Sequence, residues 1–389
     1  MAKVAVIGAG WAGCAAAMRA LNEGNHVTLL EASRSLGGRA RATPVTLPSG
    51  ESVTLDNGQH ILLGAYRETL GLMQSVGVDF EASLVRVPMR LSVFQTEAWT
   101  WRDYASLARL LTGWFLHGFS CPEAMTVRAL SAQASKRVML DVIEPLCLSA
   151  LNTATGEASG RVFLRVLKDA FLSKRFAYAG GTYASSDMLI PKINLSALLP
   201  SQVAHALQGK GSCVCLGTRV ASLEPLINEY DHVVVATPPW EAARLLRDFS
   251  PVWAASVDAL QYRAIATVYA QAPADFELPK PMRALPSDTR NPSQFVFQRT
   301  EAKGLLAFVV SDSKGDREEI ERLVLVQGET ILGVALQPVI TIVEKRATFA
   351  CTAQMKRPAK LALAGLSVVG DYVDGPYPST IEGAVLGAI

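Results

Sequence analysis

The chain opens with an apolar run, a glycine-rich turn and an alanine-rich stretch, in the order typical of a β-strand, a turn and an α-helix. Residues 4–7 are apolar with β-branched members, and three glycines follow within six residues. This pattern predicts a buried parallel strand that ends in a tight turn. Residues 14–21 are rich in alanine and stop at Asn-Glu-Gly-Asn, which predicts a helix with a C-cap. A second strand is predicted over residues 26–30 and closes at Glu31.

Later stretches predict further elements with the same two periodicities. We expect a hairpin over residues 43–56, helices over 68–76 and 316–331, strands over 84–94, 99–101, 231–236 and 339–343, a strand pair over 213–223 around Gly217, and a last strand over 361–369.

The turn after the first strand has the spacing of a dinucleotide-binding loop. Gly8 would make the turn, Gly10 would let the backbone approach a pyrophosphate, and Gly13 would let the helix pack closely on the strand. Trp11 and Ala12 complete the helix N-terminus, where the positive end of the helix dipole faces phosphate charge. A glycine turn without a ligand is the alternative.

Glu31 stands where a carboxylate accepts hydrogen bonds from a ribose diol, with Ala32 directly after it. An acid at this position argues against a cofactor with a 2′-phosphate, because the two negative charges would repel each other.

Composition and charge exclude some classes of function. The 389 residues are half hydrophobic and carry a net charge of only +2, so we expect two intertwined domains and no nucleic-acid binding. The six cysteines form no Cys-x-x-Cys pair and show no metal-ligand spacing with the five histidines, so neither a disulfide framework nor a metal site is predicted.

The predicted first strand leaves no room for a signal peptide, and no apolar run reaches the roughly 18 residues that span a bilayer. We therefore expect a cytoplasmic protein. Residues 104–119 place several large apolar side chains at helical spacing. They form either a core helix or an interfacial helix that makes peripheral contact with the inner membrane.

Gly37, Gly38 and Arg39 follow the second strand, where a nicotinamide dehydrogenase usually begins its next helix. They resemble the second half of the FAD signature in the amine oxidase and carotenoid (phytoene) desaturase superfamily. The resemblance implies FAD as the cofactor, with Gly38 and Arg39 along its diphosphate. A plain surface charge is the alternative for Arg39.

Residues 56–66, Asp-Asn-Gly-Gln-His-Ile-Leu-Leu-Gly-Ala-Tyr, closely resemble a signature of the bacterial hydroxysqualene dehydroxylase family. Residues 144–171 and 187–199 resemble the same family. The resemblance places Asn57 and Gly58 beside the flavin. It makes His60 the candidate proton donor, with Asn57 and Gln59 as polar neighbours; a histidine bonded to the backbone behind the flavin is the alternative.

The C-terminal residues resemble the closing FAD motif of the superfamily. There Gly370 and Asp371 follow an apolar strand, and Thr380 and Ile381 open a helix. The resemblance implies that Asp371 holds the ribityl chain or a phosphate and that the backbone near Ile381 faces the pyrimidine end of the flavin. Val220 would lie against the adenine.

Together these interpretations predict an α/β fold. It would consist of a discontinuous Rossmann-like FAD-binding domain and an α+β substrate-binding domain inserted into it. The FAD-binding domain would comprise residues 1–80, 191–240 and 348–389. The substrate-binding domain would comprise residues 81–190 and 241–347, and would enclose a long apolar tunnel that ends at the flavin.

The family implies reductive removal of the hydroxyl of hydroxysqualene to give squalene in hopanoid biosynthesis, with an external electron donor for FAD. A polyene desaturase, an amine oxidase and a prenyl-lipid-binding flavoprotein without turnover are the alternatives.

Overall fold

A computed structural model describes residues 1–91, 94 and 98–388. Its first large sheet has six strands in the order β10-β2-β1-β11-β18-β17, and all neighbours are parallel except the last pair. The strands are β1 Lys3–Ile7, β2 His26–Leu30, β10 Cys213–Cys215, β11 His232–Val235, β17 Ala362–Leu363 and β18 Leu366–Val368. The predicted α/β fold with a Rossmann-like sheet is confirmed.

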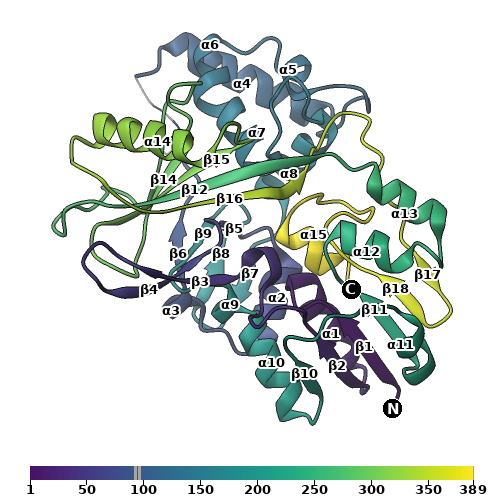
Figure 1. Ribbon diagram of the computed structural model, residues 1–389. Helices are drawn as coiled ribbons and strands as arrows, with labels where there is room; N and C mark the ends of the chain where they lie inside the picture. The colour runs from purple at the N-terminus through teal and green to yellow at the C-terminus, as the bar shows by residue number, and fades with distance from the viewer. Residues whose placement is uncertain (92–93, 95–97, 389) are drawn as a thin grey trace.

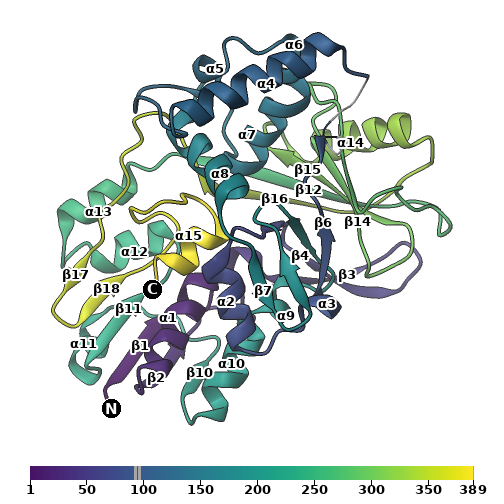
Figure 2. The same ribbon diagram turned by 180° about the vertical axis from the view of Figure 1, so that it is seen from behind.

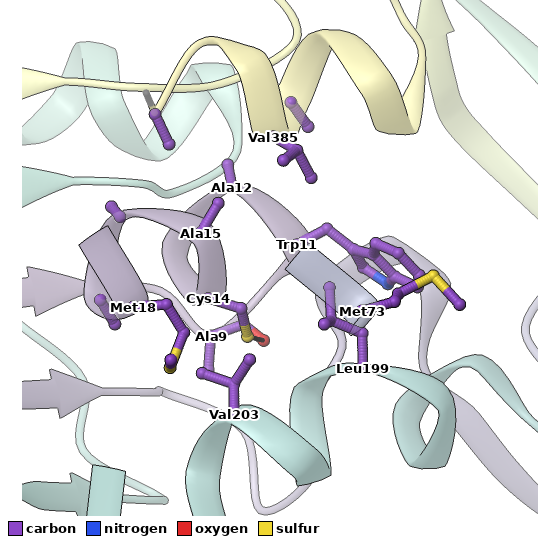
Figure 3. Packing of buried hydrophobic residues seen from close by; sticks show 14 of the residues in the cluster. Ala9, Trp11, Ala12, Cys14, Ala15, Met18, Met73, Leu199, Val203 and Val385 are labelled. Carbon is purple, nitrogen blue, oxygen red and sulfur yellow. Dashed lines mark hydrogen bonds between the residues drawn. The ribbon is translucent and has the colours of Figure 1, made fainter. Parts of the chain in front are cut away.

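Helices cover both faces of this sheet because its strands are apolar on both sides. On one face α1 (Trp11–Asn22) packs between α10 (Pro200–Gly209) and α15 (Ile381–Leu386). Figure 3 shows Ala12 and Ala15 of α1 facing Val385 of α15, and Val203 of α10 on the other side. The helices on the other side of the sheet are α11 (Glu224–Glu229), α12 (Pro239–Leu246) and α13 (Pro251–Asp258).

The second large sheet is antiparallel, with the order β13-β14-β15-β12-β16. Its strands are β12 Tyr262–Gln271, β13 Met282–Ala284, β14 Phe295–Gln298, β15 Leu305–Ser311 and β16 Gln337–Phe349, and α14 (Arg317–Leu332) packs on one face. Asp316 caps α14 by accepting from the Glu319 amide, and Gly333 ends it in the left-handed conformation.

A group of helices lies beside this sheet at the far end of the molecule from the first one (Figure 1). It consists of α4 Trp101–Leu116, α5 Val127–Leu130, α6 Lys136–Val138, a π-helical turn Met139–Ile143, α7 Glu144–Leu151 and α8 Gly160–Leu172. Within the described residues, no helix is both long enough and apolar enough to cross a membrane.

Small elements join the two large sheets. They are the hairpin β3 Ala42–Thr46 and β4 Ser52–Asp56, the strands β5 Leu62–Leu63, β6 Leu84–Val87 and β9 Met188–Pro191, the hairpin β7 Phe176–Tyr178 and β8 Gly181–Tyr183, and the helices α2 Arg67–Ser75, α3 Phe80–Ser83 and α9 Leu195–Leu198. Seen from behind, α15 and α2 lie between the first sheet and the group of helices (Figure 2).

Two predicted strands are wrong or too long in the part of the chain before α4. Residues 99–101 are not a strand, because Thr100 and Asp103 form a capping box that starts α4. The strand predicted over 84–94 ends at Val87, where β6 stops pairing with β9, and its residues 92–93 lie outside the described residues.

Two further predictions fail at glycines. Only β10 forms within residues 213–223. Gly217 is left-handed, and its amide donates a hydrogen bond to the Ser33 carbonyl in the loop after β2, so no second strand pairs with β10. The last strand is instead a hairpin, β17 and β18, with left-handed Gly365 between them.

Candidate functional site

The glycine turn lies at the carboxyl end of β1, and its three glycines meet different constraints. A Cβ on Gly8 would come 2.7 Å from the Ala236 carbonyl oxygen, and a Cβ on Gly13 would come 1.8 Å from the Gly8 carbonyl oxygen. Glycine is therefore required at both positions, because a side chain would overlap backbone atoms. Gly10 is different, because its nearest neighbour would be the Gly38 Cα at 3.9 Å. Its open side is a place where a ligand can approach the backbone.

The N-terminus of α1 faces the same space. It has no side-chain cap and no acid in its first turn, so its first amide groups remain available to an anion. Ala12 is buried in the turn, and the Trp11 ring is buried in the core beside Met73 (Figure 3). Trp11 can therefore contact a ligand through its backbone.

Glu31 directly follows β2 and lies across the glycine turn. Its Oε2 accepts from the Ala9 amide at 2.7 Å, and its Oε1 accepts from the Ser33 amide at 2.8 Å. The two bonds hold the carboxylate at the sheet edge where the first βα turn begins, with Ala32 exposed next to it. This is the position that a ribose diol requires.

Arg39 and Asp371 bring the two ends of the chain together. Arg39 Nη2 lies 2.6 Å from Asp371 Oδ1, and Arg39 Nη1 donates to the Ala347 carbonyl at 2.7 Å. Burial alone would lower the pKa of Arg39, but the Asp371 carboxylate raises it above its ordinary value. Arg39 is thus a permanent cation beside the glycine turn, since Gly38 lies directly against Gly10.

The polar run that follows β4 is held by hydrogen bonds to distant segments of the chain. Asn57 Nδ2 donates to Glu344 Oε2 at 3.3 Å and to the Arg39 carbonyl at 3.4 Å. Gln59 Oε1 accepts from the buried Arg299 at 2.8 Å. The Gly58 carbonyl oxygen lies 2.7 Å from His60 Nδ1, within hydrogen-bond distance.

This contact determines the chemistry of His60. A carbonyl only accepts, so Nδ1 carries the hydrogen and the neutral ring presents an unprotonated Nε2. Burial lowers the pKa of His60 and the Arg39 charge lowers it further, and the bond to the Gly58 carbonyl opposes them only in part. Neutral His60 therefore offers a hydrogen-bond acceptor rather than a proton, and its role as proton donor stays a prediction.

The residues of the closing FAD motif lie in and before the first turn of α15. Thr380 caps α15 by accepting from the Gly383 amide, so Ile381 starts the helix. Gly370 has no room for a side chain, because a Cβ would lie 2.6 Å from the Tyr372 ring. Val220 lies at the other end of the sheet edge, with its carbonyl held by Arg244 at 2.9 Å.

These residues fit FAD. The open Gly10 and the uncapped α1 suit a pyrophosphate, Glu31 suits a ribose, and Arg39 supplies a positive charge. The Thr237 hydroxyl next to Gly8 is also buried without a partner in the described part of the chain, and a ligand oxygen would satisfy it.

A mainly apolar cavity adjoins the closing residues. The empty space between its walls, including the part that opens to solvent, is about 980 Å³. It is lined by Ile61, Leu63, Ala65, Tyr66, Met89, Phe94, Leu146, Ser149, Ala150, Phe163, Val166, Leu167, Asp169, Ala170, Met188, Met282, Phe295, Tyr377 and Thr380. Ile61 belongs to this wall, whereas its neighbour His60 does not.

Sequence reasoning assigned no role to three polar residues of this wall, Tyr66, Asp169 and Tyr377. Tyr66 ends the run over residues 56–66, and Asp169 interrupts the apolar face of α8 four residues after Arg165. An acid at helical spacing from an arginine was the available signal. No sequence signal indicated a role for Tyr377, because its neighbours in the fold come from distant segments of the chain.

Two family models match the chain. One, described as an NAD(P)-binding Rossmann-like domain, matches residues 6–76. The other, described as a flavin containing amine oxidoreductase, matches residues 202–389.

Full-length relatives carry one name. The chain is 26% identical to a hydroxysqualene dehydroxylase of Rhodopseudomonas palustris and 25% identical to one of Sinorhizobium fredii. Each comparison covers 98% of this chain and 95% of the relative.

Solved structures share the fold. An oxidoreductase from Methanosarcina mazei superposes with a TM-score of 0.73 at 16% identity, covering 99% of this chain and 98% of that one. A putrescine oxidase superposes with a TM-score of 0.64 at 14% identity, covering 100% and 97%. The chain is therefore an FAD-dependent oxidoreductase that is similar, over nearly its whole length, to the hydroxysqualene dehydroxylases.

Proposed function

We propose that the protein removes the hydroxyl group of hydroxysqualene and releases squalene, as a step in hopanoid biosynthesis. The observation that carries this proposal is the apolar cavity, whose wall includes Thr380 of the closing FAD motif. A long isoprenoid has almost no polar handle, so it binds where apolar walls remove it from water. The relatives named hydroxysqualene dehydroxylase add support.

In this proposal the chain divides its work between two domains. Residues 1–80, 191–240 and 348–389 hold FAD through Gly8, Gly10, Gly13, Glu31 and Arg39. Residues 81–190 and 241–347 surround the substrate. When bound and reduced, FAD supplies hydride chemistry.

The apolar side chains orient the substrate and exclude water from the reacting carbon. Removal of a hydroxyl consumes two electrons, so an external donor is required for each turnover.

The test is product analysis with the reduced holoenzyme. Hydroxysqualene incubated anaerobically in deuterated buffer is expected to give squalene with one deuterium at the former carbinol carbon, while the visible absorbance of oxidised flavin returns in equal amount. Squalene without flavin oxidation would point to a lyase. A conjugated polyene formed from a more saturated precursor by the oxidised enzyme would point to a desaturase, and oxidation of an amine would point to an amine oxidase.

We also propose peripheral membrane contact through one face of α4. The Trp101, Phe115 and Leu116 side chains are 74%, 61% and 75% exposed, while Leu110 and Trp114 anchor the opposite face in the core. Exposed aromatic and apolar side chains on an amphipathic helix are typical of an interfacial element.

Flotation with liposomes tests this contact. A Phe115→Ser, Leu116→Ser variant is expected to float less than the wild type, whereas Val326→Ser, which removes an exposed apolar side chain on α14, is expected to float equally well. Equal flotation of all three proteins would contradict the membrane contact.

A further inference from the structure

The apolar cavity has a polar end formed by side chains from two distant segments. The Tyr377 hydroxyl donates to Asp169 Oδ2 at 2.7 Å, and Arg165 Nε donates to the same oxygen at 2.7 Å. The Arg165 guanidinium also lies over the Tyr377 ring, 5.5 Å from its centroid. Asp169 and Tyr377 line the cavity, so a carboxylate balanced by an arginine faces an otherwise apolar space.

Tyr377 has hydrogen-bonding capacity left on the cavity side. Its hydrogen is committed to Asp169 and Arg165 bonds to its oxygen, which leaves one lone pair of the phenol oxygen to accept a further bond. Burial and the bond to Asp169 raise the pKa of Tyr377, so the phenol stays protonated near neutral pH. Tyr377 is therefore an acceptor for an incoming O–H group.

Tyr66 supplies the complementary donor. It lines the same cavity, and its hydroxyl makes no hydrogen bond to the residues that the structure describes. Burial raises the pKa of Tyr66, and the charge of Glu382 raises it further, so this phenol also keeps its proton.

The fold holds the two tyrosines at one junction. Tyr66 is the N-cap residue of α2, and Glu382 of α15 accepts from the Glu68 and Thr69 amides in the first turn of that helix at 3.0 Å each. Thr380 at the start of α15 donates through its hydroxyl to the Tyr377 carbonyl at 2.9 Å. The contact between α2 and α15 thus brings Tyr66 to the side of the cavity that Tyr377 occupies.

We infer that Tyr66, Tyr377 and Asp169 form a binding site for the single hydroxyl group of a long isoprenoid alcohol. This inference rests on the proposed function and adds its recognition element. The substrate O–H donates to the Tyr377 oxygen, which Asp169 orients, and the substrate oxygen accepts from Tyr66. A hydrocarbon of equal length offers no hydrogen bond to the Tyr66 hydroxyl or to the Tyr377 oxygen, so the site favours the alcohol over it.

Ser149 provides a matched control in the same wall. Its hydroxyl donates to the Pro145 carbonyl of its own helix at 2.7 Å, so it is already satisfied. Ser149→Ala removes a polar atom from the cavity without touching the three residues of the hydroxyl site.

The experiment compares binding of hydroxysqualene and squalene to the protein loaded with oxidised FAD, so that no turnover occurs. Quenching of tryptophan fluorescence at a fixed detergent concentration gives both dissociation constants. Tyr66→Phe and Tyr377→Phe keep the ring and remove one hydroxyl. Each is expected to weaken hydroxysqualene binding about tenfold, with squalene binding unchanged. Ser149→Ala should leave both constants unchanged.

Equal weakening of both ligands, or no weakening of either, in variants that retain FAD and the wild-type unfolding midpoint would overturn the inference. The outcome is separate from that of the proposed function. If the wild type makes no squalene but its preference for the alcohol depends on the tyrosines, the hydroxyl site stands and the reaction assignment falls. If squalene forms and the variants bind like the wild type, the reaction stands and the hydroxyl site falls.

Discussion

Arg39 lies 2.6 Å from Asp371 although 332 positions separate them in the sequence, and this ion pair joins the loop after β2 to the loop before α15. The Asp371 side chain is only 7% exposed, so it has lost most of its hydration. Removing the Asp371 charge leaves the Arg39 guanidinium, whose side chain is 33% exposed, without its counter-charge, which costs more than the pair contributes.

Asp371→Asn is therefore expected to lower the free energy of unfolding of the holoprotein by roughly 2–4 kcal/mol. Asp258→Asn is the control, since the Arg247–Asp258 pair is about half exposed on both sides and is worth at most about 1 kcal/mol. Urea unfolding measures both. Equal losses in the two variants would contradict the structural role of the Arg39 pair.

Glu31→Ala is expected to weaken FAD binding by about 2–3 kcal/mol, because it removes charge-assisted hydrogen bonds to a ribose and releases the Ala9 amide. Glu23→Ala changes an exposed acid at the C-cap of α1, paired with Arg19, and should leave FAD affinity unchanged. Equilibrium titration of apoprotein with FAD gives both constants. A Glu31→Ala protein with wild-type affinity would remove Glu31 from the cofactor site.

Gly13→Ala is expected to lower the free energy of unfolding by at least roughly 3 kcal/mol, because its Cβ would overlap backbone atoms that cannot move aside. Gly71→Ala in α2 meets nothing within 4 Å and should raise stability by about 0.5–1 kcal/mol through helix propensity. Urea unfolding is expected to give changes of opposite sign in the free energy of unfolding of the two variants. Small changes of similar size in both would show that the glycine turn before α1 can relax.

Asp56 predicts a pH dependence of stability. Burial raises its pKa from the ordinary value of 3.8 to about 7, although the Leu195 amide and Arg299 partly oppose this. The native state therefore binds this proton more tightly than the unfolded chain. The Asp56 contribution to the free energy of unfolding is present below about pH 4 and is lost as pH rises to about 7, by up to about 1.4 kcal/mol per pH unit.

Asp56→Asn keeps an acceptor for the Leu195 amide and removes the titration. The variant should gain stability relative to the wild type between pH 5 and pH 8, as measured by urea unfolding at the two pH values. A constant difference between Asp56→Asn and wild type across this range would rule out the shifted pKa.

His60→Asn tests the two roles open to this residue. An asparagine amide can donate to the Gly58 carbonyl as Nδ1 does, but it cannot deliver a proton. Because the structure commits Nδ1 to the backbone and lowers the pKa, we expect His60→Asn to keep FAD and to form squalene at close to the wild-type rate, and His60→Ala to be slower. A loss of about 100-fold or more in both variants, with FAD retained, would instead assign His60 as the proton donor.

Elements whose signals lie in contiguous residues could be predicted from the sequence. The strand, turn and helix from Lys3 to Asn22 follow from a β-branched apolar run, three glycines and alanine spacing that are contiguous in the chain. Asp316 likewise predicts the start of α14. Local signals failed where a glycine could end a strand or continue it, as at Gly217 and Gly365, because the choice depends on which distant backbone is available for hydrogen bonding.

Which side chains meet depends on the fold and could not be predicted from local patterns. The strand order β10-β2-β1-β11-β18 brings the carboxyl ends of strands from both ends of the chain to one sheet edge, and this places Arg39 against Asp371. The cavity wall is assembled from segments between Ile61 and Thr380, and Asp169 meets Tyr377 across 208 positions. The energies of such contacts depend on distance and burial, which no local pattern of residues contains.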